Sequence, residues 1–446
     1  GKPAGGGIRG DGRGLGDVDV GPWQALAKAA DDKQSAAPAN PELQGYQPSR
    51  INVRAKSLAF GGRVLHQVDA SVTRQKDLWR VNAKADELSG LIEYRLASDT
   101  VPAPGLIYSR LDRLKMPESK DDGGTASDLL DDEPRTLPAL DIVVQDFEIH
   151  DRKLGRIEVL ARNANTSDGR REWRLAHLNL VTPEATFTSS GNWALLGGTG
   201  ANAERRTVMN FELDVRDSGD LLARFNMPGV VKKGKGKMTG QVAWMGAPLS
   251  PDYPSMTGQV HVDMQAGQFL KADPGLAKLL SVLSLQSIPR RLTLDFRDVF
   301  SEGFAFDFVR GDVRIERGLA TTNNLQMKGL NAAVLMEGKA DLEKETQDLR
   351  VVVVPEINAM TASLVATAIN PVIGLGSFLA QVFLRGPLIQ AATQEFRVDG
   401  TWSDPRVEKV KRSKAATDAA TKAVTGASGP VDQAAEAKQE KTGEMQ

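Results

Sequence analysis

The chain of 446 residues has no cysteine, only four histidines and few aromatic residues (5%). Without cysteine there is no disulfide framework, no thiolate nucleophile and no cysteine-type zinc site. The histidines, His66, His150, His177 and His261, lie far apart in sequence, and we interpret them as solvated or satisfied side chains. The G-x-S-x-G and H-E-x-x-H motifs are also missing. We therefore expect no enzymatic activity, no metal site and no cofactor.

The chain also lacks an excess of either charge, with 56 Lys and Arg against 57 Asp and Glu. A nucleic-acid-binding protein needs a basic face, so we expect no nucleic-acid partner. The first 16 residues do not begin with methionine and contain no apolar core of a signal peptide. We interpret the chain as a fragment of a longer protein, with any membrane anchor lying upstream.

What the sequence does contain is period-two alternation of apolar and polar residues in short stretches separated by glycine, asparagine and aspartate turns. Such alternation predicts antiparallel strands with one apolar and one solvated face. It is clear in residues 51–55, 157–161, 209–215 and 260–264, and clearest from Leu292 to Ile315. A weak repeat supports the prediction, because Trp79-Arg80 and Trp173-Arg174 follow similar pairs of strands. Repeating strand units indicate an elongated array.

Other segments interrupt the strands. Residues 115–138 are acidic and rich in Gly, Pro and Ser, which predicts an exposed loop, and we interpret its Asp131, Asp132 and Glu133 as a solvated charge run. Short helices are expected after Pro22 and over residues 274–285. The tail, residues 411–446, has no apolar face and is expected to be disordered.

Residues 357–384 contain no charged residue and are long enough to span a bilayer by hydropathy. Pro371, Gly374 and Gly376 favour two helical halves with a break between them. A buried or membrane-surface helical hairpin is the favoured interpretation, and a true span or a core helix pair are the alternatives.

The segment from Gly229 to Gly236 (GVVKKGKG) has the spacing of a phosphate-binding loop up to its lysine, Lys235. It then has glycine where a magnesium-binding Ser or Thr is needed, and it does not follow a buried strand. A basic turn that leads into a strand is the better interpretation.

The strands have apolar faces, but very few amphipathic helices are available to cover them. Each Leu or Phe left in water forgoes about 1.5–3 kcal/mol. Either the sheet folds into a sandwich or barrel, or it forms a trough that holds an apolar ligand. The sequence by itself favours the sandwich, because sandwiches are common.

Several segments resemble the C-terminal part of the YhdP family of AsmA-like proteins. They include residues 140–144 (LDIVV), 182–186 (TPEAT), 251–254 (PDYP), 267–275 (GQFLKADPG), 283–292 (LSLQSIPRRL), 295–300 (DFRDVF) and the stretch from Asn370 to Pro405. The resemblance covers residues 50–410 and is most specific in the central third.

This resemblance implies a mainly β fold: an elongated, strongly curved antiparallel sheet that forms an open trough, with a few short helices and a C-terminal helical hairpin. It implies a periplasmic protein anchored in the inner membrane by an N-terminal helix outside this chain. Its function would be to carry phospholipids through an apolar groove to the outer membrane, which the C-terminal helices would meet. We therefore favour the trough.

The segments expected on this basis are an N-terminal part (1–50), a β-repeat unit (51–114), the acidic loop (115–138), a continuous trough (139–355), an apolar helical segment (356–394), a final strand (395–410) and the tail. The residues expected to line the groove are Leu292, Leu294, Phe296, Phe304, Phe306, Phe308, Met327, Val334 and Met336. Those expected to contact a membrane are Val372, Ile373, Leu375, Phe378, Leu379, Val382, Phe383 and Leu384. No catalytic residue is carried over.

Two other functions remain as alternatives. One is a structural or scaffolding β-array that binds protein partners in the cell envelope. The other is a carbohydrate-active β-solenoid enzyme, which we rank last because paired carboxylates and stacking aromatics are missing on these strands.

Overall fold

The computed structural model describes the strands and their short connections. The described residues are 15–19, 50–60, 63–98, 101–116, 137–149, 151–165, 171–197, 204–248, 250–270, 304–329, 332–355, 375 and 393–410. The expected helices at 22–30 and 274–285, the expected tail and nearly all of residues 356–394 lie outside these ranges.

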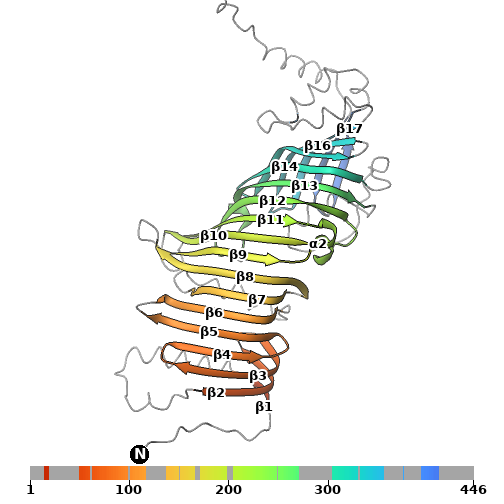
Figure 1. The fold of residues 1–446 in the computed structure, drawn as a ribbon. Helices are drawn as coiled ribbons and strands as arrows, with labels where there is room; N and C mark the ends of the chain where they lie inside the picture. Colours follow the sequence, from red (N-terminus) through yellow and green to blue (C-terminus); the bar gives the residue numbers. More distant parts are fainter. Residues whose placement is uncertain are drawn as a thin grey trace, which may run out of the picture. The chain divides into compact units, whose positions relative to one another are not determined.

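The described residues form one open sheet of nineteen strands that follow one another in chain order (Figure 1). The prediction of a mainly β, antiparallel-dominated fold is confirmed, and the sandwich alternative is wrong for these strands because they belong to a single sheet. The chain divides into two compact units, Gly1–Val260 with Ile315–Gly318, and His261–Arg314 with Leu319–Gln446. Each unit is described by itself.

The described residues of unit 1 contain twelve complete strands and one α-helix, α2 (Ser218–Arg224). The strands are β1 (Leu15–Asp19), β2 (Arg50–Phe60), β3 (Arg63–Gln75), β4 (Leu78–Lys84), β5 (Leu88–Ser98), β6 (Val101–Met116), β7 (Ala139–Ile149), β8 (Arg152–Asn165), β9 (Arg171–Val181), β10 (Ala185–Gly197), β11 (Glu204–Val215) and β12 (Val231–Met245). A short 3-10 helix, η3 (Tyr253–Ser255), follows β12.

Unit 2 contains most of β13 (Thr257–Phe269) and of β14 (Phe304–Glu316), together with β15 (Leu319–Gly329), β16 (Ala332–Asp341), β17 (Thr346–Pro355), β18 (Gln394–Thr401) and β19 (Pro405–Lys409). The strands from β15 to β19 pair antiparallel in chain order. The range expected to form one final strand, 395–410, contains two, β18 and β19.

Two parallel pairings divide unit 1 into similar halves. β1 pairs parallel with β2, and β6 pairs parallel with β7, whereas the other neighbouring pairs from β2 to β12 are antiparallel. Parallel neighbours need a long crossover, because the chain must return to the end of the sheet where the first strand began before it starts the next strand. The acidic segment supplies this connection between Met116 and Ala139.

The two halves match the repeat seen in the sequence. Trp79 lies in the third strand after one parallel pairing, in β4, and Trp173 lies in the third strand after the next, in β9. Each is paired with an aromatic residue on the following strand, Trp79 with Tyr94 and Trp173 with Trp193. The repeat is therefore a repeat of strand pairing as well as of sequence.

The helix α2 was missed in the sequence analysis, although its N-cap was a usable signal. The Asp217 carboxylate accepts hydrogen bonds from the backbone N–H groups of Gly219 and Asp220 at 2.9 and 3.0 Å. Such a cap satisfies N–H groups that have no partner within the helix. At seven residues, however, α2 is too short to show a hydrophobic period.

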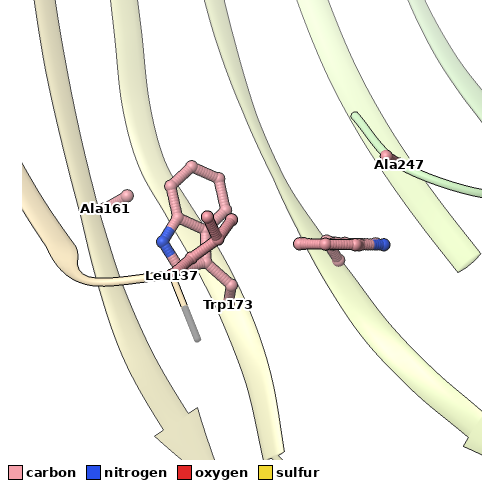
Figure 2. Close-up of a cluster of buried hydrophobic side chains, with 5 residues drawn as sticks. Leu137, Ala161, Trp173 and Ala247 are labelled. Carbon is pink, nitrogen blue, oxygen red and sulfur yellow. The ribbon is translucent and has the colours of Figure 1, made fainter. Parts of the chain in front are cut away.

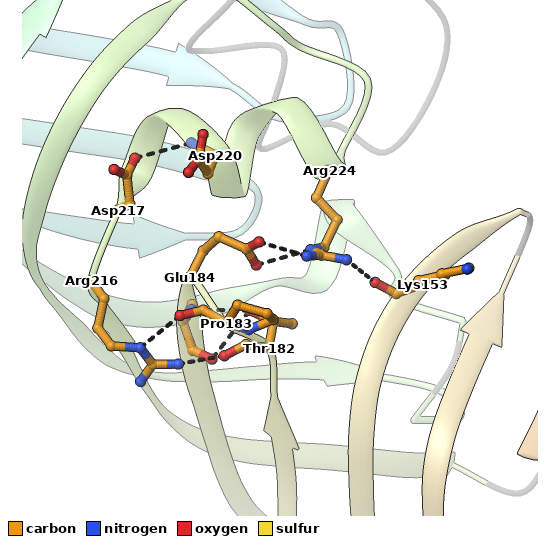
Figure 3. A network of polar contacts seen from close by, with 9 residues as sticks. Lys153, Thr182, Pro183, Glu184, Arg216, Asp217, Asp220 and Arg224 are labelled. Atoms are coloured by element: carbon orange, nitrogen blue, oxygen red, sulfur yellow. Dashed lines mark hydrogen bonds and ion pairs between the residues drawn. The ribbon is translucent and has the colours of Figure 1, made fainter.

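A polar network joins α2 to the turns at one end of the strands of unit 1, which we call the α2 edge (Figure 3). Arg224 donates to both carboxylate oxygens of Glu184, at 3.0 and 2.5 Å, and to the backbone oxygen of Lys153. Arg216 donates to the backbone oxygens of Thr182 and Pro183. The network therefore connects the β7–β8 turn, the β9–β10 turn and the end of β11. Because hydrogen bonds from Arg224 favour the ionised form, the pKa of Glu184 is lowered from its ordinary value.

Replacing Glu184 by Gln should lower the free energy of unfolding by about 1–3 kcal/mol at neutral pH, because the change removes a charged partner of the partly buried Arg224. A carboxyl group whose pKa is lowered by folding stabilises above its unfolded pKa of 4.5, and the effect is lost as the pH falls through the folded pKa. The difference between wild type and E184Q in chemical denaturation should therefore shrink below pH 4.5.

A matched control is Glu212→Gln, which breaks the exposed pair of Glu212 with Lys237 (2.7 Å). It should change stability by less than about 1 kcal/mol, because solvent screens exposed pairs. Equal effects of E184Q and E212Q would contradict a stabilising role of the network.

Candidate functional site

The candidate site is one face of the sheet, and register defines it in unit 1. Residues paired across neighbouring strands point to the same face, and the next residue along each strand points to the other. One row of paired residues crosses β2 to β12 and is mostly apolar: Ile51, Val72, Val81, Ile92, Ser109, Ile142, Val159, Leu178, Ser189, Phe211 and Gly240. We call the side that this row occupies the apolar face.

The next row along the strands lies on the opposite, polar face. It consists of Asn52, Ser71, Asn82, Leu91, Arg110, Val143, Glu158, Asn179, Thr188, Glu212 and Thr239. The alternation thus stays in phase over eleven strands, although five of the strand pairs contain register shifts. An in-phase pattern of this kind gives a continuous apolar surface on one side of the sheet.

The polar face is held by ion pairs between neighbouring strands. Glu93 on β5 has a side chain that is only 6% exposed, between Arg80 and Arg95 at 2.7 and 3.3 Å. Burial by itself would raise the pKa of Glu93, but the hydrogen bonds from both arginines outweigh it and the pKa is lowered. Arg110 on β6 pairs with Asp141 on β7 at 2.8 Å. These pairs link the strands without using the apolar face.

The apolar face of unit 1 is only half covered. Ile92, Val159, Leu178 and Phe211 have intermediate exposure, and Ile51 is 40% exposed. Among the described residues of this unit there is no second sheet, and its one α-helix lies at the strand ends (Figure 1). Within the described part of the chain, the side chains of this face therefore have no apolar layer over them of the kind that normally covers such a surface.

The two Phe side chains near the middle of the face show how the sequence accommodates large rings on it. Phe187 and Phe211 stack with their ring centroids 6.4 Å apart. The Phe211 ring lies over Gly240 on β12, where an added Cβ would meet ring carbons at 2.8 Å. A side chain at Gly240 would therefore displace the ring.

Tryptophan side chains cover the apolar face at the opposite end of the strands from α2. Trp173 and Trp193 pack with Leu137, Ala161 and Ala247, and Trp193 is fully buried (Figure 2). The indole N–H of Trp173 donates to the backbone oxygen of Pro138 at 3.0 Å. Segments that precede β7 and follow β12 thus cover this edge, and the less covered part of the face lies between it and α2.

Unit 2 has a face of the same kind, and it contains several of the expected groove residues. Met327 pairs with Val334, and Val334 with Val353. Met336 pairs with Val351, and Val351 with Phe396. The 3.4 Å ion pair of Asp307 with Lys328 places both on the opposite side, so Phe306 lies on the side of Met327.

These unit 2 side chains are buried, with exposed fractions of 5% for Phe306, 3% for Met327, 2% for Val334 and 6% for Met336. Phe308 has intermediate exposure, with the Arg310 guanidinium 3.9 Å from its ring centroid. Only the backbone of Phe304 is described, and Leu292, Leu294 and Phe296 lie outside the described residues. The assignment of these nine residues to a groove stays a prediction.

Of the eight expected membrane-contacting residues, Leu375 alone is described, and it is helical and 1% exposed. The described residues contain no helix that is long and apolar enough to cross a membrane. The membrane role of this segment also stays a prediction.

The half-covered residues of unit 1 were not among the expected site residues. The alternation at Val159 and Phe211 was recognised, but all nine expected groove residues lie between Leu292 and Met336. The usable signal was the length over which the alternation continues, because a single sheet with one apolar face on every strand has more apolar surface than its own loops can cover.

The described residues show no competing chemical site. No group of three or more His, Cys, Asp or Glu that could hold a metal ion is found among them. His66 and His261 each contact one carboxylate, Glu87 at 2.6 Å and Asp312 at 2.8 Å, and both histidines are more than half exposed. His177 is on β9 and His150 is outside the described residues. The interpretation of GVVKKGKG as a turn leading into a strand is wrong for most of the segment, because only Gly229 and Val230 precede β12 and residues 231–236 are part of it.

Comparison with known proteins gives one family and one curated relative. Residues 8–407 match the family model described as YhdP protein. Over 228 residues the chain is 29% identical to the intermembrane phospholipid transporter YhdP of Escherichia coli strain K12, which is 51% of this chain and 18% of that protein. The chain thus spans less than a fifth of the relative's length in this match. No solved structure matches the chain.

The difference in burial between the two units predicts different tolerance to truncation. Phe306→Ala should destabilise unit 2 by about 3–5 kcal/mol, because it leaves a cavity beside the Phe269 ring, whose centroid is 5.1 Å away. Leu178→Ala should cost unit 1 about 1 kcal/mol, because its side chain is already partly in water. Hydrogen exchange resolved by segment measures both changes separately, and a larger loss for L178A would show that the apolar face is covered.

Proposed function

The chain belongs to the YhdP family, and from this membership we propose that it is part of a non-enzymatic carrier that moves phospholipids between the inner and outer membranes. The observation that supports the proposal is the half-covered apolar face of unit 1, which continues in phase from β2 to β12. The carrier would act in the periplasm and support the lipid supply and barrier of the outer membrane.

In the proposed mechanism, acyl chains lie against the apolar face and take the place of water. Each methylene removed from water contributes about 0.8 kcal/mol, so two acyl chains on such a surface are stabilised much as they are in a bilayer. Apolar contacts are non-directional, and a bound lipid can therefore shift from one strand to the next with little loss of contact. The face equilibrates lipids, and a net direction requires a gradient or an external energy source.

The polar face has a separate role in this proposal. Its ion pairs, such as Arg80 with Glu93 and Arg110 with Asp141, keep the other side of the sheet soluble. They also join the strands across the sheet, so that the apolar face does not need to be filled by the protein's own side chains to hold the strands together.

The alternative is a scaffold that binds protein partners in the envelope. Phospholipid that purifies with the chain distinguishes the two, since a scaffold does not need it.

Photocrosslinking tests the proposal directly. A crosslinking amino acid at position 178, on the apolar face, should capture phospholipid, and one at position 179, on the polar face of the same strand, should not. Mass spectrometry of the crosslinked protein gives the ratio of lipid-labelled to unlabelled protein for each position. The two sites share their strand and their neighbours, so equal labelling would contradict lipid binding on the apolar face, and labelling at neither site would favour the scaffold.

We further propose that residues 356–394 meet the outer membrane and that an anchor upstream of this chain holds the protein in the inner membrane. Of the proposed contact residues, Leu375 packs inward, so the contact would involve the other seven. Deleting residues 356–394 should reduce flotation with phospholipid vesicles, because these residues supply the long uncharged stretch. Circular dichroism checks that the sheet persists, and unchanged flotation of a folded variant would contradict the proposal.

A further inference from the structure

Unit 1 carries a group of lysines at the same edge as α2. Lys232, Lys233 and Lys235 are exposed at the start of β12, and no ion pair with another described residue is found for them. Lys153, also exposed, lies at the start of β8 on this edge. We call these four lysines the basic edge. Lys237, two residues further along β12, is different because it pairs with Glu212 at 2.7 Å.

The helix α2 holds the backbone of the basic edge in place. The Ser218 hydroxyl donates to the backbone oxygen of Lys233 at 2.6 Å, at one end of the helix, and Arg224 donates to the backbone oxygen of Lys153 at the other. Figure 3 shows the second contact, with the Lys153 side chain extending away from the network. Six helical steps of 1.5 Å separate the two ends by about 9 Å. β8 and β12 are four strands apart in the sheet, or about 19 Å, so α2 links these two places along the strand ends without making Lys153 and Lys233 neighbours.

The local backbone also supports an exposed arrangement. Lys233 has a φ of 57°, in the left-handed region, and Gly234 follows with a φ of 88°. A non-glycine residue in this region needs support from its surroundings, which the Ser218 hydrogen bond provides. Two neighbouring carboxylates are already engaged, because Glu184 binds Arg224 and Asp217 caps α2, and Asp220 on α2 is exposed.

The basic edge borders the apolar face. Met238 on β12 pairs with Leu213, and Leu213 pairs with Phe187, so these three side chains belong to that face. Lys235 precedes Met238 by three residues, or about 10 Å of strand, and the alternation places it on the side of Lys237, so its side chain reaches the apolar face only around the strand ends. The polar interface of a bilayer leaflet is about 5–8 Å thick, so this offset is similar to that between the phosphate and the acyl chains of a lipid. Lysine side chains can also extend over several ångströms to keep their charge in water.

We propose that the basic edge contacts the phosphate of phospholipids whose acyl chains lie on the apolar face. This inference rests on the proposed function and adds an orientation to it: the headgroup is at the α2 edge, and the tryptophan-covered edge is on the other side. Because all glycerophospholipids share the phosphate, the basic edge would distinguish phospholipids from lipids without phosphate, and would not select one headgroup.

The test compares lipids with identical acyl chains on the purified full chain. Phosphatidylethanolamine, phosphatidylglycerol and diacylglycerol, which has no phosphate, compete for binding, and native mass spectrometry measures the occupancy of each. Wild type should favour the two phospholipids over diacylglycerol by about fivefold. The variant K232Q/K233Q/K235Q should bring this ratio close to one and leave diacylglycerol binding unchanged.

A matched control variant is K56Q/K76Q/K84Q, which removes three exposed lysines from β2, the β3–β4 turn and β4. It changes the net charge equally and should keep the wild-type ratio. An equal loss in both variants would overturn the inference, because the effect would then be one of total charge. An unchanged ratio in K232Q/K233Q/K235Q would overturn it as well.

Two further outcomes have clear meanings. If the chain's own acidic segment neutralised these lysines, K232Q/K233Q/K235Q would lower the unfolding temperature without changing the lipid ratio, and the inference would be wrong. If neither phospholipid nor diacylglycerol bound to wild type, the proposed function itself would fail together with the inference. If the lipids bind but K232Q/K233Q/K235Q leaves the ratio of phospholipid to diacylglycerol unchanged, only the inference fails and the proposed function stands.

Discussion

The structure depends on one constraint: every strand of an open sheet must place its apolar residues on the same side. Eleven neighbouring strands of unit 1 meet this requirement, from Ile51 on β2 to Gly240 on β12. A shift of one residue in any strand would exchange its two faces. The bulges that follow Ser189 and Leu160 absorb such shifts, and the apolar side stays continuous.

The consequence of this constraint is a division of labour between the faces and the edges. Ion pairs on the polar face, such as that of Arg80 with Glu93, link adjacent strands. The tryptophan cluster around Trp193 and the polar network around Arg224 hold the two edges. The middle of the apolar face contains side chains of intermediate exposure, such as those of Val159 and Leu178. A surface of this kind is unfavourable in water, which is why an apolar ligand fits it.

The two units differ in how far they cover this face. In unit 2, five successive residues of β16, Ala332 to Met336, and four of β17, Val351 to Val354, are buried, so both sides of these strands are shielded. The corresponding residues of unit 1 are half-covered. The local sequence explains the difference, because β16 and β17 contain continuous apolar runs, whereas the unit 1 strands alternate.

The sequence by itself determined the fold class and the side of each strand that is apolar, because alternation with period two is a local property. It also indicated the repeat, since Trp79 and Trp173 occupy equivalent strands. Only the tertiary structure decided which apolar residues are covered. Phe306 and Val159 are both part of alternating strands, but one is buried and the other is half in water. Burial depends on residues distant in sequence, and so does the link between Lys153 on β8 and Lys233 on β12, which α2 makes through hydrogen bonds at its two ends.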